Sequence, residues 1–166
     1  MNVPKAYELA LATVIREFAD VGPGFVFRCW QTLRSDPAWK VTSGADRTRF
    51  TVDLRAAPPV SDEGPSNRTV TAIIEARAKT EDDQDHAKIS TAYDAIQDVV
   101  DKLHDQFYDG EPYGAELARF LELMQEECGT TFGFGGLTFA DGTAPYDDDG
   151  YSVIGIGLTA HYSRRN

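Results

Sequence analysis

The chain has 166 residues, of which 42% are hydrophobic and 26% charged, as is typical of one folded globular domain and unlike disordered or fibrous proteins. It carries 16 Lys and Arg against 27 Asp and Glu, a formal net charge of -11. This charge repels phosphate backbones and anionic bilayer surfaces. We therefore expect no sequence-specific nucleic-acid partner and no membrane partner.

The first predicted element is a helix over residues 5–19, which Gly22-Pro23-Gly24 ends. Its apolar residues recur at three- and four-residue steps, at Tyr7, Leu11, Val14, Ile15 and Phe18. Charged residues interrupt this apolar pattern, so we expect no export signal here, and no segment approaches the length of a transmembrane helix. Residues 25–40 show no sustained period, and a short strand followed by a turn is one interpretation of them.

Two strands are predicted next, over residues 47–56 and 70–79, because apolar and polar residues alternate in both. Pro58-Pro59 and a polar loop separate them. The second run, from Val70 to Lys79, has the clearest alternation in the chain. Each strand is therefore expected to bury one face.

The charges on these strands predict a register. We expect antiparallel pairing with Asp53 opposite Arg77, which also places Leu54 opposite Ala76. In that register Arg55 falls opposite Glu75, so opposite charges complement each other on the polar face. A solvated sheet face with weak cross-strand pairs is preferred here over a polar catalytic surface.

Two helices are predicted in the second half of the chain. The acidic run EDDQD, at residues 81–85, opens the long one and caps its first turn. Its apolar face holds Ile89, Ile96, Val100 and Leu103, and we expect this face to pack against the apolar face of the sheet. After a break at residues 110–114, residues 115–127 form the shorter helix.

The last predicted elements are strands. Glycines interrupt the segment TTFGFGGLTFADG and favour a bulge or bend in it. The final alternating run forms a long terminal strand, with Gly155 and Gly157 on one face leaving a shallow trough. The chain as a whole is therefore predicted to be a single α+β domain over residues 1–166. Its mostly antiparallel sheet has about four strands, with helices packed on one face.

The three aspartates before the last strand raise the question of a calcium loop. Aligning Gly150 with the glycine of that pattern places Asp147 and Asp149 at ligand positions, but Pro145 at the first position and Ile156 at the twelfth. Both ends of the pattern fail. Asp149-Gly150 is instead a strong signal for a tight turn, so no metal site is predicted.

The remaining candidates for chemistry are weak. Cys29 and Cys128 are the only cysteines, and two reduced thiols in a reducing compartment are expected, with one disulfide as the alternative. A nucleophilic Cys128 assisted by His104 or His161 has no local signature around it. These two histidines and His86 lie on three different predicted elements, without the spacing of a zinc site. No catalytic residue or cofactor is predicted.

The order of elements carries a resemblance. The strand FTVDLRAA, a polar loop, the strand TVTAIIEARA, a long helix after an acidic run, and a last strand after PYDDDG follow one another between Arg47 and Tyr162. This arrangement resembles the tail terminator and tail completion proteins of long-tailed bacteriophages. In that family a strand of this kind precedes an acidic helix, and an aspartate-rich turn before the last alternating strand is common.

The resemblance implies a virion structural protein without enzymatic activity, assembled in the host cytoplasm and located at the head-proximal end of the tail. Its copies would form a ring, usually hexameric, that caps the tail tube. The implied partners are other copies of the chain, the tail tube protein and a neck or head-completion protein. Candidate contact residues for the ring or the tube are Asp53, Arg55, Glu75, Arg77, Lys79, Asp147, Asp148 and Asp149.

Two alternatives stay open from the sequence. A head-tail connector or head-closure protein of the neck is also small, ring-forming and non-enzymatic. A small α+β enzyme or ligand-binding domain that uses Cys128, His104 and the aspartates is less favoured, because no signature supports it.

Overall fold

The structure is a computed structural model, and it describes residues 3–22, 25–29, 51–56, 60–61, 68–110, 112–129, 132–140 and 144–164. The helices are α1 (Val3–Phe18), α2 (Ala87–Asp109) and α3 (Ala115–Cys128), and two single turns of 3-10 helix, η3 (Thr80–Asp82) and η4 (Gln84–His86), precede α2. The strands are β1 (Val26–Cys29), β2 (Thr51–Ala56), β3 (Val60–Ser61), β4 (Arg68–Lys79), β5 (Phe132–Ala140), β6 (Tyr146–Asp148) and β7 (Tyr151–Arg164).

One sheet organises the molecule, with its main strands in the order β1-β2-β4-β7-β5. Only β1 and β2 run parallel, and β2, β4, β7 and β5 form a continuous antiparallel set. The short strands β3 and β6 pair with β4 and β7. The prediction of an α+β fold with a mostly antiparallel sheet is confirmed, and the short edge strand β1 adds a parallel pair to the four strands expected.

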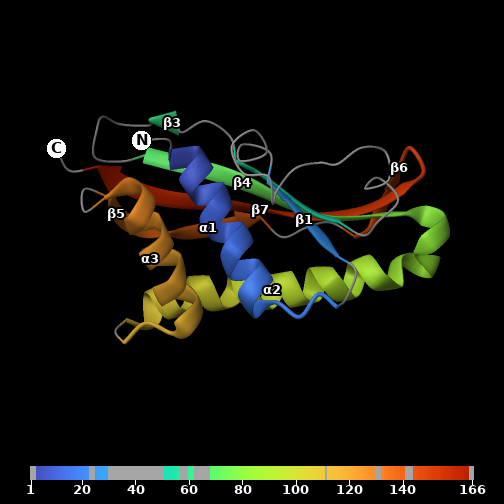
Figure 1. Ribbon diagram of the computed structural model, residues 1–166, viewed down its shortest axis with the longest axis horizontal. Helices are drawn as coiled ribbons and strands as arrows, with labels where there is room; N and C mark the ends of the chain where they lie inside the picture. The colour runs from blue at the N-terminus through green and yellow to red at the C-terminus, as the bar shows by residue number, and fades with distance from the viewer. Residues whose placement is uncertain are drawn as a thin grey trace.

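The three helices lie on one face of the sheet (Figure 1). Helix α1 packs on β1, β2 and β4, while α2 packs on β7, β4 and β5 and α3 fills the space between α1, α2 and β5. The predicted apolar face of α2, from Ile89 to Leu103, is buried as expected. No described helix is long and apolar enough to cross a bilayer.

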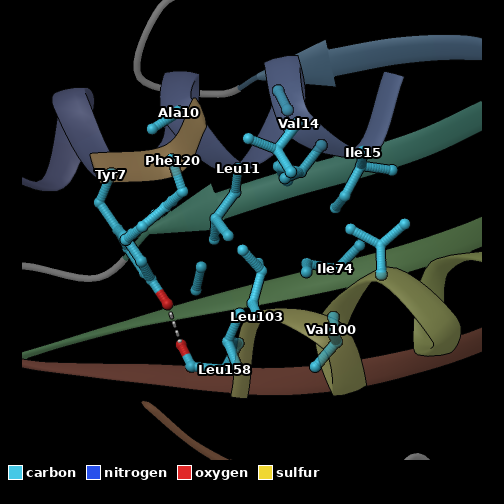
Figure 2. Close-up of a cluster of buried hydrophobic side chains, with 14 of the residues drawn as sticks. Tyr7, Ala10, Leu11, Val14, Ile15, Ile74, Val100, Leu103, Phe120 and Leu158 are labelled. Carbon is cyan, nitrogen blue, oxygen red and sulfur yellow. Dashed lines mark hydrogen bonds between the residues drawn. The ribbon is translucent and has the colours of Figure 1, made fainter. Parts of the chain in front are cut away.

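The core lies between these helices and the inward-facing residues of the sheet. Every second residue from Val70 to Ala78 on β4 and from Ile154 to Tyr162 on β7 is buried, because alternate side chains of a strand point to opposite faces. Figure 2 shows Tyr7 of α1 reaching through this cluster to donate a hydrogen bond from its hydroxyl to the Leu158 carbonyl oxygen at 3.0 Å. Complete burial raises the pKa of the Tyr7 hydroxyl well above its usual value.

The observed register between β2 and β4 corrects the predicted one. Asp53 lies opposite Glu75, and Arg77 lies opposite Thr51, a shift of two residues from the predicted pairing. A shift of two keeps every residue on its predicted face, so the alternating pattern is equally satisfied by both registers. The predicted charge pairs could not select between the two registers, because exposed ion pairs stabilise a structure by less than about 1 kcal/mol.

The start of α2 also differs from the prediction. The helix begins at Ala87, after η3 and η4, and Asp85 and His86 both have φ of 57°. Asp83 caps it from outside, with its carboxylate accepting hydrogen bonds from the backbone N–H of Lys88 at 2.7 Å and of Ile89 at 3.4 Å. The acidic run therefore caps the helix as expected, but through this one buried carboxylate.

The glycines of β5 form the predicted irregularity. The pairing of β5 with β7 shifts between Phe134 and Gly136, and Gly136 has φ of 133°, which favours glycine. The shift lets Phe134 pack against the Phe107 and Phe120 rings, with centroids 5.1 and 5.4 Å away, on the same side of the sheet as buried Leu137. The bulge thus lets the glycine-rich edge strand β5 place Phe134 in contact with α2 and α3.

Candidate subunit interface

The sheet face opposite the helices carries no helix in the described part of the chain (Figure 1). We call it the open face. Its outward residues include Thr69, Thr71, Ile73, Glu75, Arg77 and Lys79 of β4, Val153, Gly155, Gly157, Thr159 and His161 of β7, and Thr138 of β5. Ile73 is 48% exposed, an unusual degree for a large aliphatic side chain on a central strand. This face is the main surface that the sheet offers to a partner.

The structure brings most of the predicted contact residues to one end of this face. Glu75, Arg77 and Lys79 follow one another along β4, and the register places the backbones of Asp53 and Arg55 on β2 beside them, opposite Glu75 and Ile73. The side chains of those two β2 residues lie outside the described part of the structure. Their backbones lie on β2 as expected, but two residues away from the predicted pairing with β4.

The three aspartates form the tip of a hairpin at the same end. Strand β6 pairs with β7 from Tyr146 opposite Val153 to Asp148 opposite Tyr151. The two-residue turn between them has φ of 49° at Asp149 and 81° at Gly150, as a type I′ turn requires. The sequence prediction of a tight turn that leads into the last strand is confirmed, and all three residues of β6 are exposed.

We call Glu75, Arg77, Lys79 and the three hairpin aspartates the charged end. Within it Arg77 Nη2 lies 3.7 Å from Asp148 Oδ2, and the guanidinium carbon of Arg77 lies 5.0 Å from the centre of the Tyr151 ring. Lys79 Nζ lies 4.0 Å from Glu81 Oε1. These are long, solvent-exposed contacts, which bind the charges only weakly to each other.

Ion pairs on the helix side are shorter. Lys102 Nζ lies 3.0 Å from Asp98 Oδ2, and the hydrogen bond to Asp98 is the main reason that the pKa of Lys102 is raised. Arg119 Nε lies 3.2 Å from Glu17 Oε2, which likewise raises the pKa of Arg119. Lys102 and Arg119 are therefore held by acids of their own chain, whereas Arg77 and Lys79 of the charged end keep room for acceptors on a partner.

A polar contact ties the hairpin to the start of α2. His86 Nδ1 lies 2.8 Å from Ser152 Oγ, and His86 Nε2 lies 3.9 Å from Asp147 Oδ1. Thr80 reinforces the junction, since its backbone N–H donates to the Gly150 carbonyl oxygen at 3.0 Å. Residues far apart in sequence thus hold the acidic hairpin against the 3-10 turns.

His86, Ser152 and Asp147 have the residue types of a hydrolase triad, but the geometry does not suit catalysis. The Ser152 side chain is completely buried, so its hydroxyl cannot reach a substrate. Asp147 is 63% exposed and too far from the imidazole, at 3.9 Å, for the hydrogen bond that orients a catalytic histidine. The arrangement anchors the hairpin.

The surface beside this anchor is slightly hollowed. A shallow depression of about 470 Å³ is lined by Lys79, Thr80, Glu81, Asp149, Gly150 and Tyr151. It is shallow and open, and charged side chains take part in its lining, unlike the enclosed apolar pockets that bind small molecules. A protruding side chain of another protein fits such a depression better than a cofactor does.

The residues considered for metal or nucleophilic chemistry are separated in the structure. His104 contacts Asp105 and the Tyr108 ring on α2, while His161 Nε2 contacts Thr138 Oγ1 at 3.2 Å on the open face. Cys128 and Cys29 are both buried, and no disulfide joins them. Among the described residues, no group of three or more His, Cys, Asp or Glu side chains is placed to hold a metal ion.

Comparison with known proteins adds no family to this description. No family model and no curated protein matches the sequence. Function is therefore inferred from the geometry of the charged end and from the order of the elements.

Sequence reasoning missed the contacts that join distant segments. The bond of His86 to Ser152 spans 66 positions, and the hydrogen bond between Thr71 Oγ1 and Thr159 Oγ1, at 2.8 Å, spans 88. Each partner looks like an ordinary polar residue of a helix start or a solvated strand face. No local signal in the sequence marks either pair, because the first depends on how the start of α2 lies against β7 and the second on the register of β4 with β7.

Proposed function

We propose that this chain is a non-enzymatic virion structural protein, a tail terminator whose copies form a ring that caps the tail tube and joins it to the neck. The observation that carries the proposal is the charged end, where both signs of charge lie on a sheet face that no described helix covers and on a projecting hairpin, and where the ion pairs of Arg77 and Lys79 within the chain are long, at 3.7 and 4.0 Å. Surfaces that carry both signs suit contacts between identical subunits related by rotation.

The order of elements supports the same proposal. The strands, the acidic-capped helix and the aspartate-rich turn that resemble the tail terminator family are all present as folded elements, in the expected sequence. In the proposed structural role, the charged end contacts the next subunit or the tube end.

The direct test uses tail tubes assembled without this protein. Such tubes are expected to be overlong or irregular, and adding the purified protein back should give capped ends that bear a ring with a central hole in electron micrographs. Tubes of normal length whose heads leak or fail to join would contradict termination and would indicate a neck protein instead.

A charge-exchanged variant tests whether the charged end makes the contact. The double change Arg77→Asp with Asp148→Arg keeps the net charge and the pairing of opposite signs within the chain, so stability should change by no more than about 1 kcal/mol. It inverts the charges that a neighbour meets, so capping should be lost. Lys102→Glu on α2 is the control, and it should cap normally. Normal capping by the double variant would exclude the charged end as the contact.

A further inference from the structure

The hairpin that carries the three aspartates is joined to the sheet by a short ladder. Strand β6 pairs with β7 over three residues, from Tyr146 to Asp148, and all three are exposed. In the described part of the chain, no strand pairs with β6 on its other side. Short edge ladders with few buried contacts are the parts of a protein that open first. The orientation of the aspartates therefore depends on contacts outside this ladder.

The turns before α2 supply such contacts at the same end of the sheet (Figure 1). Thr80 donates from its backbone N–H to the Gly150 carbonyl oxygen at 3.0 Å, and from its hydroxyl to Asp147 Oδ1 at 3.4 Å. His86 Nδ1 lies 2.8 Å from Ser152 Oγ. Together these contacts reach β6, the turn and β7. The one to Ser152 is the shortest of the three, and it ends on a completely buried residue.

The backbone at His86 is unusual. Asp85 and His86 both have φ of 57°, a left-handed conformation that costs most non-glycine residues free energy, although Asp, Asn and His adopt it more readily. Residues keep such a conformation where their surroundings hold them. On one side of His86 lies Ser152. On the other, the Asp83 carbonyl oxygen accepts from the His86 N–H at 3.2 Å, and the Asp83 carboxylate caps α2. The start of the helix thus directs the imidazole toward the hairpin.

We propose that His86 is a positioning residue for the contact that the charged end makes with its partner. It holds Ser152, and with it the hairpin, so that the three aspartates meet the partner in one orientation. A surface that is ordered before it binds loses less conformational entropy on binding. The inference rests on the proposed function, in which the charged end makes the contact that caps the tube.

The two ring nitrogens of His86 have different parts in this arrangement. Nδ1 is within hydrogen-bond distance of Ser152, whereas Nε2 lies 3.9 Å from Asp147 Oδ1, beyond that range. An asparagine side chain carries an amide nitrogen about as far from the backbone as Nδ1, and it accepts positive φ. Glycine also accepts positive φ but offers no side chain. Asn and Gly at position 86 therefore form a matched pair that differs in the contact to Ser152.

Amide hydrogen exchange of the isolated protein, followed by NMR, tests the anchor without any partner. In His86→Gly the amides of residues 147–152 should exchange at least about fivefold faster than in the wild type, because a buried hydroxyl loses its hydrogen bond. In His86→Asn they should exchange within about threefold of the wild-type rate. Unchanged chemical shifts in the centres of β4 and α2 would show that the fold is intact. Equal hairpin exchange in all three proteins would overturn the anchor.

A double-mutant cycle with Ser152→Ala shows whether the two residues act through one contact. Ser152→Ala removes the hydroxyl, and it should loosen the hairpin as His86→Gly does. Because either single change already breaks the contact, the double variant should exchange no faster than the faster of the two single variants. Effects that multiply in the double variant would exclude a shared contact and with it the proposed role of His86.

Capping tests the positioning role itself, because His86 and Ser152 lie outside the set of residues that forms the charged end. The concentration of His86→Gly that caps half of the tail tubes should be at least about fivefold that of the wild type, and that of His86→Asn within about threefold. A loosened hairpin that caps as well as the wild type would overturn the positioning role. Wild-type protein that caps no tubes would contradict the proposed function, and the exchange rates would still show whether His86 holds the hairpin.

Discussion

The two faces of one sheet have opposite characters although the same strands supply both. On the helix side, β4 from Val70 to Ala78 and β7 from Ile154 to Tyr162 present buried apolar residues against α1 and α2. On the other side, the same strands present threonines, charges, two glycines and an exposed Ile73. Folding of this domain therefore depends mainly on one face of the sheet, which leaves the other available for contacts with other molecules.

A matched pair of substitutions gives the sharpest test of that comparison. Ile96→Asp on α2 places a charge in a site that is only 1% exposed, and we expect it to cost more than about 4 kcal/mol and to prevent folding. Ile73→Asp on the open face should change the free energy of unfolding of the monomer by no more than about 0.5 kcal/mol.

Urea unfolding at low protein concentration, followed by circular dichroism, compares the two. A cooperatively folded Ile96→Asp protein would show that α2 buries a different face. Loss of folding in Ile73→Asp would instead show that the open face belongs to the core of the domain.

Two glycines extend the comparison to the backbone. Gly136 has φ of 133°, and a Cβ there would lie 3.2 Å from the Tyr108 hydroxyl oxygen and 3.4 Å from Phe107 Cε1. Gly136→Val should therefore destabilise the protein by about 1–3 kcal/mol. Gly157→Val, in open space and in a strand, should be neutral or slightly stabilising. The measurement is the melting temperature of each variant. A Gly136→Val protein that melts at a higher temperature than the wild type would show that neither the positive φ at Gly136 nor the nearby rings exclude a side chain.

The smallest expected effect concerns a single hydroxyl. Tyr7→Phe removes the hydrogen bond to the Leu158 carbonyl, and it should cost about 1 kcal/mol near neutral pH. Burial raises the pKa of Tyr7 above the value of the unfolded chain, about 10. The stability that depends on neutral Tyr7 is therefore complete below about pH 10 and is lost as the pH rises above it.

The measurement is the free energy of unfolding as a function of pH. The wild-type curve should fall more steeply than that of Tyr7→Phe above about pH 10, and the gap between them should close. Tyr108→Phe, at a residue that is 62% exposed, is the control and should follow the wild type. Parallel curves for Tyr7→Phe and wild type would show that Tyr7 ionises without cost.

Local patterns in the sequence determined which residues face the core. Apolar residues at period two assigned the inward faces of β4 and β7, and period 3.6 assigned that of α2, because burial of apolar surface is the largest favourable contribution to folding. The pair Asp149-Gly150 likewise predicted the tight turn, because few residue pairs accept positive φ at both positions of such a turn. These assignments needed no knowledge of distant segments.

Only the tertiary structure decided how those elements meet. The register of β2 with β4 differs by two residues from the one that charges favoured, because alternation cannot distinguish registers that differ by an even number. The anchoring of the hairpin by His86 and Ser152, and the position of Ile73 beside Gly157, follow from the pairing of β4 with β7 and from the place of α2. Contacts between segments so far apart depend on the packing of the whole domain, which no local window of sequence contains.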